Sequence, residues 1–244
     1  MPIMGRAYCQ QPLVRTGSSR RYSSMSDASV LAHTLPLMPR ALKTSKSLPF
    51  TGDAEANKYL VDDPLALLIG MVLDQQVPLE KAFAGPFVLR QRLGKELDAA
   101  EIATMSPDDL VALFVERPAL HRFPASMAAR VQDLCRLLAE EYQGDAAALW
   151  TSATSGAELL KRVKALPGFG EQKSRIFVAL LAKQFAVRPK GWEAAAGVFG
   201  EAGSLSSVAD IDSPAALLAV REHKRALKAA AKSTVTAKSH SKAI

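Results

Sequence analysis

The chain has 244 residues, which allow one large domain or two small ones, and 48% of them are hydrophobic, enough for a buried core. No run of 18 uninterrupted apolar residues occurs, so a membrane-spanning helix is not expected. The two cysteines, Cys9 and Cys135, are too few for an iron–sulfur cluster, no Cys/His group has zinc spacing, and a structural disulfide is not expected. These features are typical of a protein from a reducing, intracellular compartment.

The net charge of +7 is unevenly distributed along the chain. Residues 1–52 contain seven basic residues and one acidic residue, residues 223–244 contain six basic residues and no acidic one, and the segment between them is net acidic. Within residues 161–190, however, eight basic residues accompany a single acid, Glu171. Such a stripe suits phosphate groups, and it equally suits the solvated face of an ordinary helix.

The two ends of the chain have the composition of flexible segments. Residues 1–25 are rich in Arg and Ser and contain no acid, which resembles a mitochondrial transit peptide; the alternative is a start assigned upstream of a true start at Met25. Residues 1–52 are therefore expected to form a flexible basic leader, and residues 233–244 a disordered basic tail. The expected location is the mitochondrial matrix if the leader is a transit peptide, and the bacterial cytoplasm or nucleoid otherwise.

The sequence predicts that the middle of the chain, residues 53–232, is helical. Over residues 53–232 the apolar residues recur at helical spacing, and no alternation of period two persists beyond four residues, so we expect an all-α domain. Asp63 is expected to cap a buried helix that begins at Pro64 and is stopped by Pro78. Ser106, also followed by a proline, predicts a second capped helix start of the same kind.

Two later helices, over residues 157–166 and about 171–184, flank the turn at residues 167–170. The two glycines of this turn leave amides uncovered, and the first amides of the following helix have no internal partner and carry the positive end of its dipole. Phe169 is expected to tuck between the two helices and fix their angle. Such a turn can hold a DNA phosphate without reading sequence, although glycine turns also close many ordinary helix pairs.

Two motifs carry a family resemblance. LPGFG at 166–170, followed by Gln-x-x-x-Ile, resembles the helix–hairpin–helix of the HhH-GPD DNA glycosylase superfamily, which includes endonuclease III and the alkyladenine glycosylases. LLIGMVLDQQVP at 67–78 resembles the early helix of the same superfamily, and with Arg-Pro-Lys-Gly-Trp at 188–192 the pattern is similar to a mostly bacterial branch of it. The resemblance covers about residues 55–200 and implies two small helical lobes with a cleft between them.

The resemblance also implies a set of DNA contacts. Gln76, with Gln75 beside it, would enter the space left by an extruded base or probe the base pair; otherwise these are two exposed glutamines near a helix end. For Lys173 and Arg175 the alternative to a phosphate contact is ordinary surface charge. The residues expected to contact DNA at the hairpin are Gly168, Phe169, Gly170, Gln172, Lys173 and Arg175.

Two positions depart from the family pattern. Members that cleave the strand carry a lysine two residues after the last hairpin glycine, where this chain has Gln172, so lyase activity through that position is not expected. The family's essential aspartate falls near Lys190, and the next carboxylate, Glu193, is either the catalytic residue or a surface residue that opens a helix. Trp192 and Phe199 either line a base pocket, where a flipped base would stack, or belong to the core.

The resemblance implies a monofunctional DNA glycosylase of base-excision repair, which acts as a monomer, flips a damaged base out of double-stranded DNA and hydrolyses its N-glycosidic bond. No metal or organic cofactor is expected, and a monovalent cation at the hairpin is the ion that the resemblance allows. Lys190 at the aspartate position favours the alternative, a catalytically inactive relative that binds damaged or distorted DNA. A third hypothesis is a helical interaction protein whose hairpin only packs.

Overall fold

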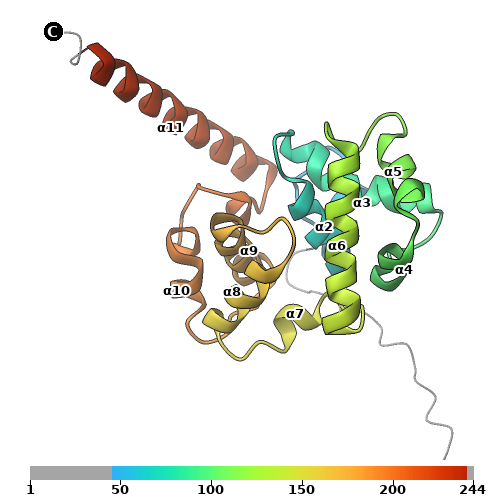
Figure 1. Ribbon diagram of the computed structural model, residues 1–244. Helices are drawn as coiled ribbons and strands as arrows, with labels where there is room; N and C mark the ends of the chain where they lie inside the picture. Colours follow the sequence, from blue (N-terminus) through green and yellow to red (C-terminus); the bar gives the residue numbers. More distant parts are fainter. Residues whose placement is uncertain (1–45, 241–244) are drawn as a thin grey trace, which may run out of the picture. The chain divides into compact units, whose positions relative to one another are not determined.

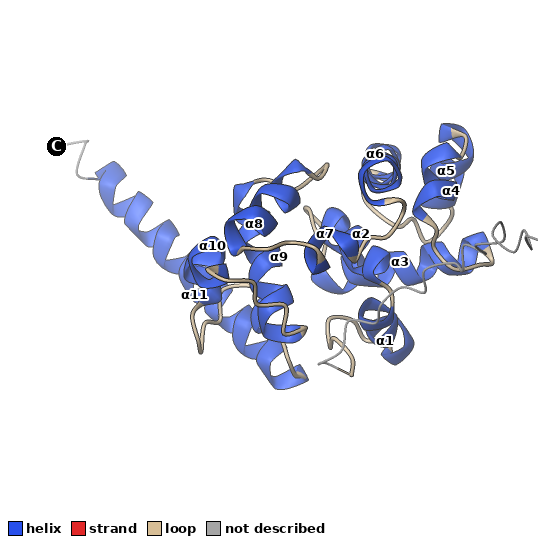
Figure 2. Cartoon of the chain, turned by 90° about the horizontal axis from the view of Figure 1, so that it is seen from below, coloured by secondary structure: helices blue, strands red, loops and turns tan. Residues whose placement is uncertain are grey.

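The computed structural model describes residues 46–240, with side chains up to Ala229, and all of them belong to one compact unit, Met38–Ile244. Within this part of the chain the regular secondary structure is helical throughout, which confirms the predicted all-α class (Figure 2). The helices are α1 (Ala54–Asp62), α2 (Pro64–Leu73), α3 (Leu79–Leu93), α4 (Ala99–Thr104), α5 (Pro107–Val115), α6 (Pro124–Tyr142), α7 (Ala148–Thr151), α8 (Gly156–Ala165), α9 (Glu171–Gln184), α10 (Trp192–Ala196) and α11 (Pro214–His240), with 3-10 helices η1 (Gly197–Gly200) and η2 (Val208–Asp210).

The segment before α1 is part of the core. Leu48 and Phe50 are fully buried, and the Phe50 ring packs edge-on against Phe83 at 4.7 Å between centroids. The Asn57 carboxamide oxygen holds this segment by accepting the backbone N–H of Phe50 at 3.1 Å and of Thr51 at 2.8 Å. The domain therefore begins before residue 53, and the predicted leader is wrong at its C-terminal end because so short a segment has no readable apolar period. Residues 1–45, with the rest of that leader, lie outside the described residues.

Helix α2 packs against α1, α3 and α6, and Figure 1 shows it beside the long helix α6. Every residue of α2 is buried, as the apolar run predicted. The Asp63 carboxylate caps it by accepting the N–H of Leu65 at 2.8 Å and of Ala66 at 3.1 Å, which confirms the predicted cap. The helix ends at Leu73, so residues 74–77 form a non-helical link to α3.

The long helix α6 packs against α4 and α5, and α3 also contacts α5. Helix α5 begins after Ser106 as expected, but the Ser106 side chain makes no capping hydrogen bond, so that detail of the prediction is wrong. Pro107 at the first helical position and the acidic Asp108 and Asp109 in the first turn favour the helix start instead.

Helices α8 and α9 form the hairpin, and their bounds agree with the sequence prediction to within a residue (Figure 1). Phe169 is only 5% exposed and meets the Phe177 ring of α9 at 5.7 Å, so it tucks into the core as predicted. Helix α10 packs against both α8 and α9. The close approach needs Gly156, because a Cβ there would lie 2.5 Å from the carbonyl oxygen of Gly191.

Helix α11 follows η2 and begins at Pro214, where the Ser213 hydroxyl accepts the N–H of Ala216 at 3.1 Å. Val220 is buried, and Arg221 forms an ion pair with Glu80 of α3. The helix continues to His240, past residue 232 where the sequence analysis placed the end of the domain, because its alanines and lysines are strong helix formers. None of the helices within the described residues has the length and apolar content needed to cross a membrane.

Candidate nucleic-acid interface

The turn between α8 and α9 presents backbone N–H groups that have no partner among the residues that the structure describes. Gly168 has a φ of +83°, which favours glycine, and it lets the chain reverse direction while Phe169 N–H donates to the Leu166 carbonyl at 3.1 Å. The N–H groups of Gly168 and Gly170 find no acceptor among the described residues. Within the described part of the chain no side chain caps α9, so the N–H groups of its first turn are also available at the positive end of the helix dipole. This is the geometry of an anion site.

The link after α2 meets this turn, so the structure brings together the two motifs that the sequence analysis singled out. A Cβ added to Gly168 would lie 3.7 Å from Nε2 of Gln75 and 3.7 Å from Cδ of Arg130. The Gln75 side chain is held in place: Nε2 donates to the Val72 carbonyl at 2.7 Å, and Oε1 accepts from Nη1 of Arg130 at 2.8 Å. Gln75 therefore has a fixed position beside the hairpin.

His121 fixes the same link from the other side. Its Nδ1 accepts the N–H of Phe123 at 3.1 Å, which leaves the proton on Nε2, and Nε2 then donates to the Gln75 carbonyl at 2.8 Å. The imidazole is 2% exposed, so His121 has a structural role. The next aromatic side chain, Phe123, is 44% exposed, with the Arg122 guanidinium 4.8 Å from its ring centre.

Gln76 differs from Gln75 in both conformation and contacts. Its φ of +54° lies in the left-handed region, which costs a non-glycine residue about 1 kcal/mol or more. Its side chain is exposed and makes no hydrogen bond to any described residue. An exposed amide side chain next to an anion site suits a residue that probes a base pair. No hydrogen bond between the Gln76 side chain and a described residue compensates for the strain of its backbone.

Two basic side chains at the hairpin, Arg175 and Lys164, form hydrogen bonds or ion pairs within the protein. Arg175 donates from Nη1 to the Ala195 carbonyl of α10 at 3.0 Å and from Nε to Glu171 at 2.7 Å. Lys164 also pairs with Glu171, and hydrogen bonds from Lys164 and Arg175 hold the pKa of that carboxyl below its usual range. Arg175 thus holds α9 to α10, while Lys164 remains exposed at the end of α8.

A cavity of about 440 Å³ adjoins the hairpin, formed by the end of α2, the first turn of α9, η2 and α11. Its volume falls in the range of small-molecule sites, roughly 300–1,000 Å³. Exposed Gln172 lies on its rim, whereas Lys173 turns inward and donates from Nζ to the Met71 carbonyl at 2.6 Å. Burial lowers the pKa of Lys173 to about 8, against the attraction of Asp74. The residues that line the cavity are Met71, Asp74, Gly170, Glu171, Gln172, Lys173, Ile176, Ser207, Val208 and Lys224.

The structure does not bring Glu193 or Trp192 to this cavity. Glu193 is exposed in the first turn of α10, and the Lys190 carbonyl accepts the N–H of Gly156 at 2.9 Å. Trp192 is half-buried against the core, with the Arg188 guanidinium 5.9 Å from its ring centre, and Phe199 packs against the core as well. Both aromatic residues therefore fit the core alternative.

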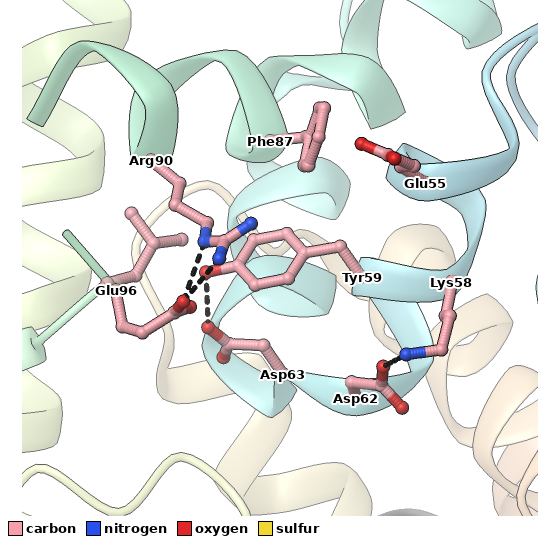
Figure 3. A pocket seen from close by; sticks show the side chains of 9 residues that line it. Glu55, Lys58, Tyr59, Asp62, Asp63, Phe87, Arg90 and Glu96 are labelled. Carbon is pink, nitrogen blue, oxygen red and sulfur yellow. Dashed lines mark hydrogen bonds and ion pairs between the residues drawn. The ribbon is translucent and has the colours of Figure 1, made fainter. Parts of the chain in front are cut away.

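A second cavity, of about 520 Å³, lies between α1 and α3 and contains several charged side chains (Figure 3). They are paired with one another: Tyr59 donates its hydroxyl proton to Asp63 at 2.7 Å, and Arg90 donates from Nε to Glu96 at 2.8 Å, with its guanidinium 5.0 Å from the Tyr59 ring centre. Burial, followed by the neighbouring Asp63, raises the pKa of Tyr59. This cluster of paired groups joins α1 to α3 and anchors the cap of α2, which gives Tyr59, Asp63, Arg90 and Glu96 a structural role.

Sequence reasoning missed three residues that the structure adds to the hairpin site, namely Asp74, Arg130 and Lys224. Asp74 carried a signal, because it is the first charged residue after a fully apolar run and so stands where the buried helix α2 reaches its end. Arg130 and Lys224 come from α6 and α11, and no local pattern relates either one to a hairpin far away in the chain.

Comparisons with protein-family models, with curated proteins and with solved structures return no match for this chain. Within residues 46–240, no group of three or more His, Cys, Asp or Glu side chains is arranged to hold a metal ion. The chemistry of the hairpin and its cavity is therefore the basis for a functional assignment.

Proposed function

We propose that this protein binds double-stranded DNA through the α8–α9 hairpin and is a monofunctional DNA glycosylase of base-excision repair. One observation carries the proposal: the unpartnered N–H groups of Gly168, Gly170 and the first turn of α9 lie beside the link that holds Gln75 and Gln76. Amides at a helix start bind a phosphate, and an exposed amide side chain next to them can replace the hydrogen bonds of an extruded base.

The surroundings of the hairpin support the same function. Arg130 and Lys164 place positive charge next to the amides. Phe123, bound through its N–H to the His121 ring that holds the link, offers an exposed ring for stacking. In this proposal the two sets of helices, α1–α6 and α7–α10, are the two small lobes of an HhH-GPD fold, and DNA lies across the cleft between them. The protein acts as an intracellular monomer, in a bacterial cytoplasm or nucleoid or in a mitochondrial matrix, without an organic or metal cofactor; a monovalent cation at the hairpin carbonyls is compatible with it.

The chemistry proposed is hydrolysis without strand cleavage, because Gln172 stands where the strand-cleaving members have their lysine. A second candidate function is binding to damaged DNA without catalysis. It is favoured by Lys190, which has an exposed side chain near the position of the family's aspartate and a carbonyl bound to Gly156.

Two measurements test the proposal. The first is the salt dependence of affinity for a short fluorescent duplex, which should fall steeply with salt as phosphate contacts release counterions. The second is a panel of duplexes, each with one uracil, alkylated purine or oxidised base, incubated with the protein and then treated with alkali. Breaks at the modified base support the glycosylase, binding without breaks supports the inactive relative, and absence of salt-dependent binding excludes both.

A further inference from the structure

The cavity beside the hairpin contains a carboxylate that the fold does not use. Asp74 is half-buried, its backbone N–H donates to the Gly70 carbonyl at 3.0 Å, and its side chain has neither a hydrogen bond nor an ion pair among the described residues. A charged group placed in this way is unfavourable for folding unless a partner compensates for its lost hydration.

Two other half-buried aspartates show what a structural carboxylate does in this fold. Asp63 accepts two backbone N–H groups of α2 and the Tyr59 hydroxyl. Asp210 accepts the N–H groups of Ser206 and Ser207, each at 3.0 Å, and pairs with Lys183 at 2.6 Å. Asp74 has no comparable set of bonds to the residues that the structure describes, so its carboxylate remains available to a molecule in the cavity.

The groups around Asp74 complete a reaction site. Met71, Ile176 and Val208 supply apolar surface for the flat face of a base, and Gln172 supplies an amide at the rim. Lys173 faces the same cavity from α9 and attracts Asp74 without a direct ion pair. Gly170 and the first turn of α9, which carry the unpartnered amides, also line this cavity, so a phosphate bound there would hold its nucleotide at the mouth.

We propose that Asp74, and not Glu193, is the catalytic carboxylate, and that this cavity receives the flipped nucleotide. This inference rests on the proposed glycosylase function. The Asp74 carboxylate takes a proton from a water molecule while the water oxygen forms a bond to C1′ of the sugar. The C1′–N bond breaks, its electron pair leaves with the base, and the base gains a proton from the Lys173 ammonium. Proton transfer from Asp74 to Lys173, directly or through solvent, then restores both side chains.

The ionisation of the two groups suits these roles. Burial raises the pKa of Asp74 against the attraction of Lys173 and Lys224, which makes its carboxylate a stronger base than an exposed one. Burial lowers the pKa of Lys173 to about 8, which makes its ammonium a better acid near neutral pH. The other charged groups that face the pair are Glu171 on α9 and Arg130 on α6.

Single-turnover release of the base from the duplex panel tests the assignment. Asp74→Asn should slow release by roughly 100-fold or more, Asp74→Glu should recover part of that loss, and Glu193→Gln should keep the wild-type rate. Asp62→Asn, which removes an exposed aspartate of α1, is the matched control for charge and should also keep the wild-type rate. The affinity of Asp74→Asn for a duplex with a non-hydrolysable abasic analogue should stay near that of the wild type, since Asp74 acts on the reaction and not on the phosphates.

Stability separates catalysis from folding in this test. Because the Asp74 carboxylate has no bond to lose, Asp74→Asn should melt at or above the wild-type temperature, and a variant that unfolds contradicts the premise. A wild-type rate in Asp74→Asn, or slow release in Glu193→Gln alone, overturns the assignment while the proposed function stands. Wild-type protein that releases no base from any duplex overturns the glycosylase function together with the assignment.

Discussion

Lys173→Met perturbs the cavity at its buried amine and gives a prediction with a definite magnitude. The Lys173 pKa falls from an ordinary 10.5 to about 8 in the folded protein. At about 1.4 kcal/mol per pKa unit, this difference corresponds to roughly 3 kcal/mol, and solvent access through the open mouth reduces it to about 2 kcal/mol.

The sign follows from proton binding. Between about pH 8 and the ordinary lysine pKa, the unfolded chain binds more protons at this residue than the folded protein does, so folding becomes more favourable as pH rises. Lys173→Met has no such titration. Its free energy of unfolding relative to wild type should therefore be highest near pH 7 and should decline by about 2 kcal/mol by about pH 10.

Urea unfolding followed by circular dichroism at several pH values measures this difference. Lys224→Met removes a lysine from the rim of the same cavity, and subtracting its curve removes the general effect of losing one positive charge. A difference between Lys173→Met and wild type that does not change with pH would refute the reasoning, because it would mean that the Lys173 amine is solvated and that the cavity does not desolvate its contents.

Three further predictions concern the rest of the domain. Gly156→Ala should destabilise the protein by about 1–3 kcal/mol in thermal melts, because its Cβ would lie within 2.6 Å of backbone atoms of α10, and an unchanged melting temperature would contradict that packing. Gln76→Gly should raise stability by about 1 kcal/mol by relieving the positive φ while it weakens binding to a duplex with an abasic analogue; unchanged binding would remove Gln76 from the interface. Burial raises the pKa of the Cys135 thiol, so in a Cys9→Ser variant the native protein should react with Ellman's reagent only as fast as it unfolds, and rapid labelling would show that the core opens locally.

Local signals account for what the sequence could predict. Asp63 followed by Pro64 marks the start of α2, and the glycines at 168 and 170 mark the turn between α8 and α9, because caps and turns depend on residues close together in the chain. The apolar run of α2 predicted a buried helix for the same reason. These elements have the bounds that the sequence analysis gave them to within a residue, apart from the earlier end of α2.

Long-range contacts account for what the sequence could not predict. Lys173 of α9 donates to the Met71 carbonyl of α2, which lies 102 positions away in the chain. The spacing of apolar residues in α2 or in α9 does not predict that contact. Leu48 and Phe50 join the core although they lie in a short irregular segment. Family spacing pointed to Glu193 as the carboxylate, whereas the half-buried carboxylate beside the hairpin is Asp74, which depends on how the end of α2 meets α9.

Affinity of Gly170→Ala for a duplex with an abasic analogue tests most directly whether the hairpin amides hold a DNA phosphate. Gly170 has a φ of −79°, and an added Cβ would meet no atom within 4 Å, so the variant should fold like the wild type. Gly52→Ala, equally free of contacts, is the matched control. We expect Gly170→Ala to lose about 1.5–3 kcal/mol of binding, or roughly tenfold to a hundredfold in affinity, while Gly52→Ala binds like the wild type. Equal affinity of the two variants would contradict the account, since no phosphate would then approach the turn.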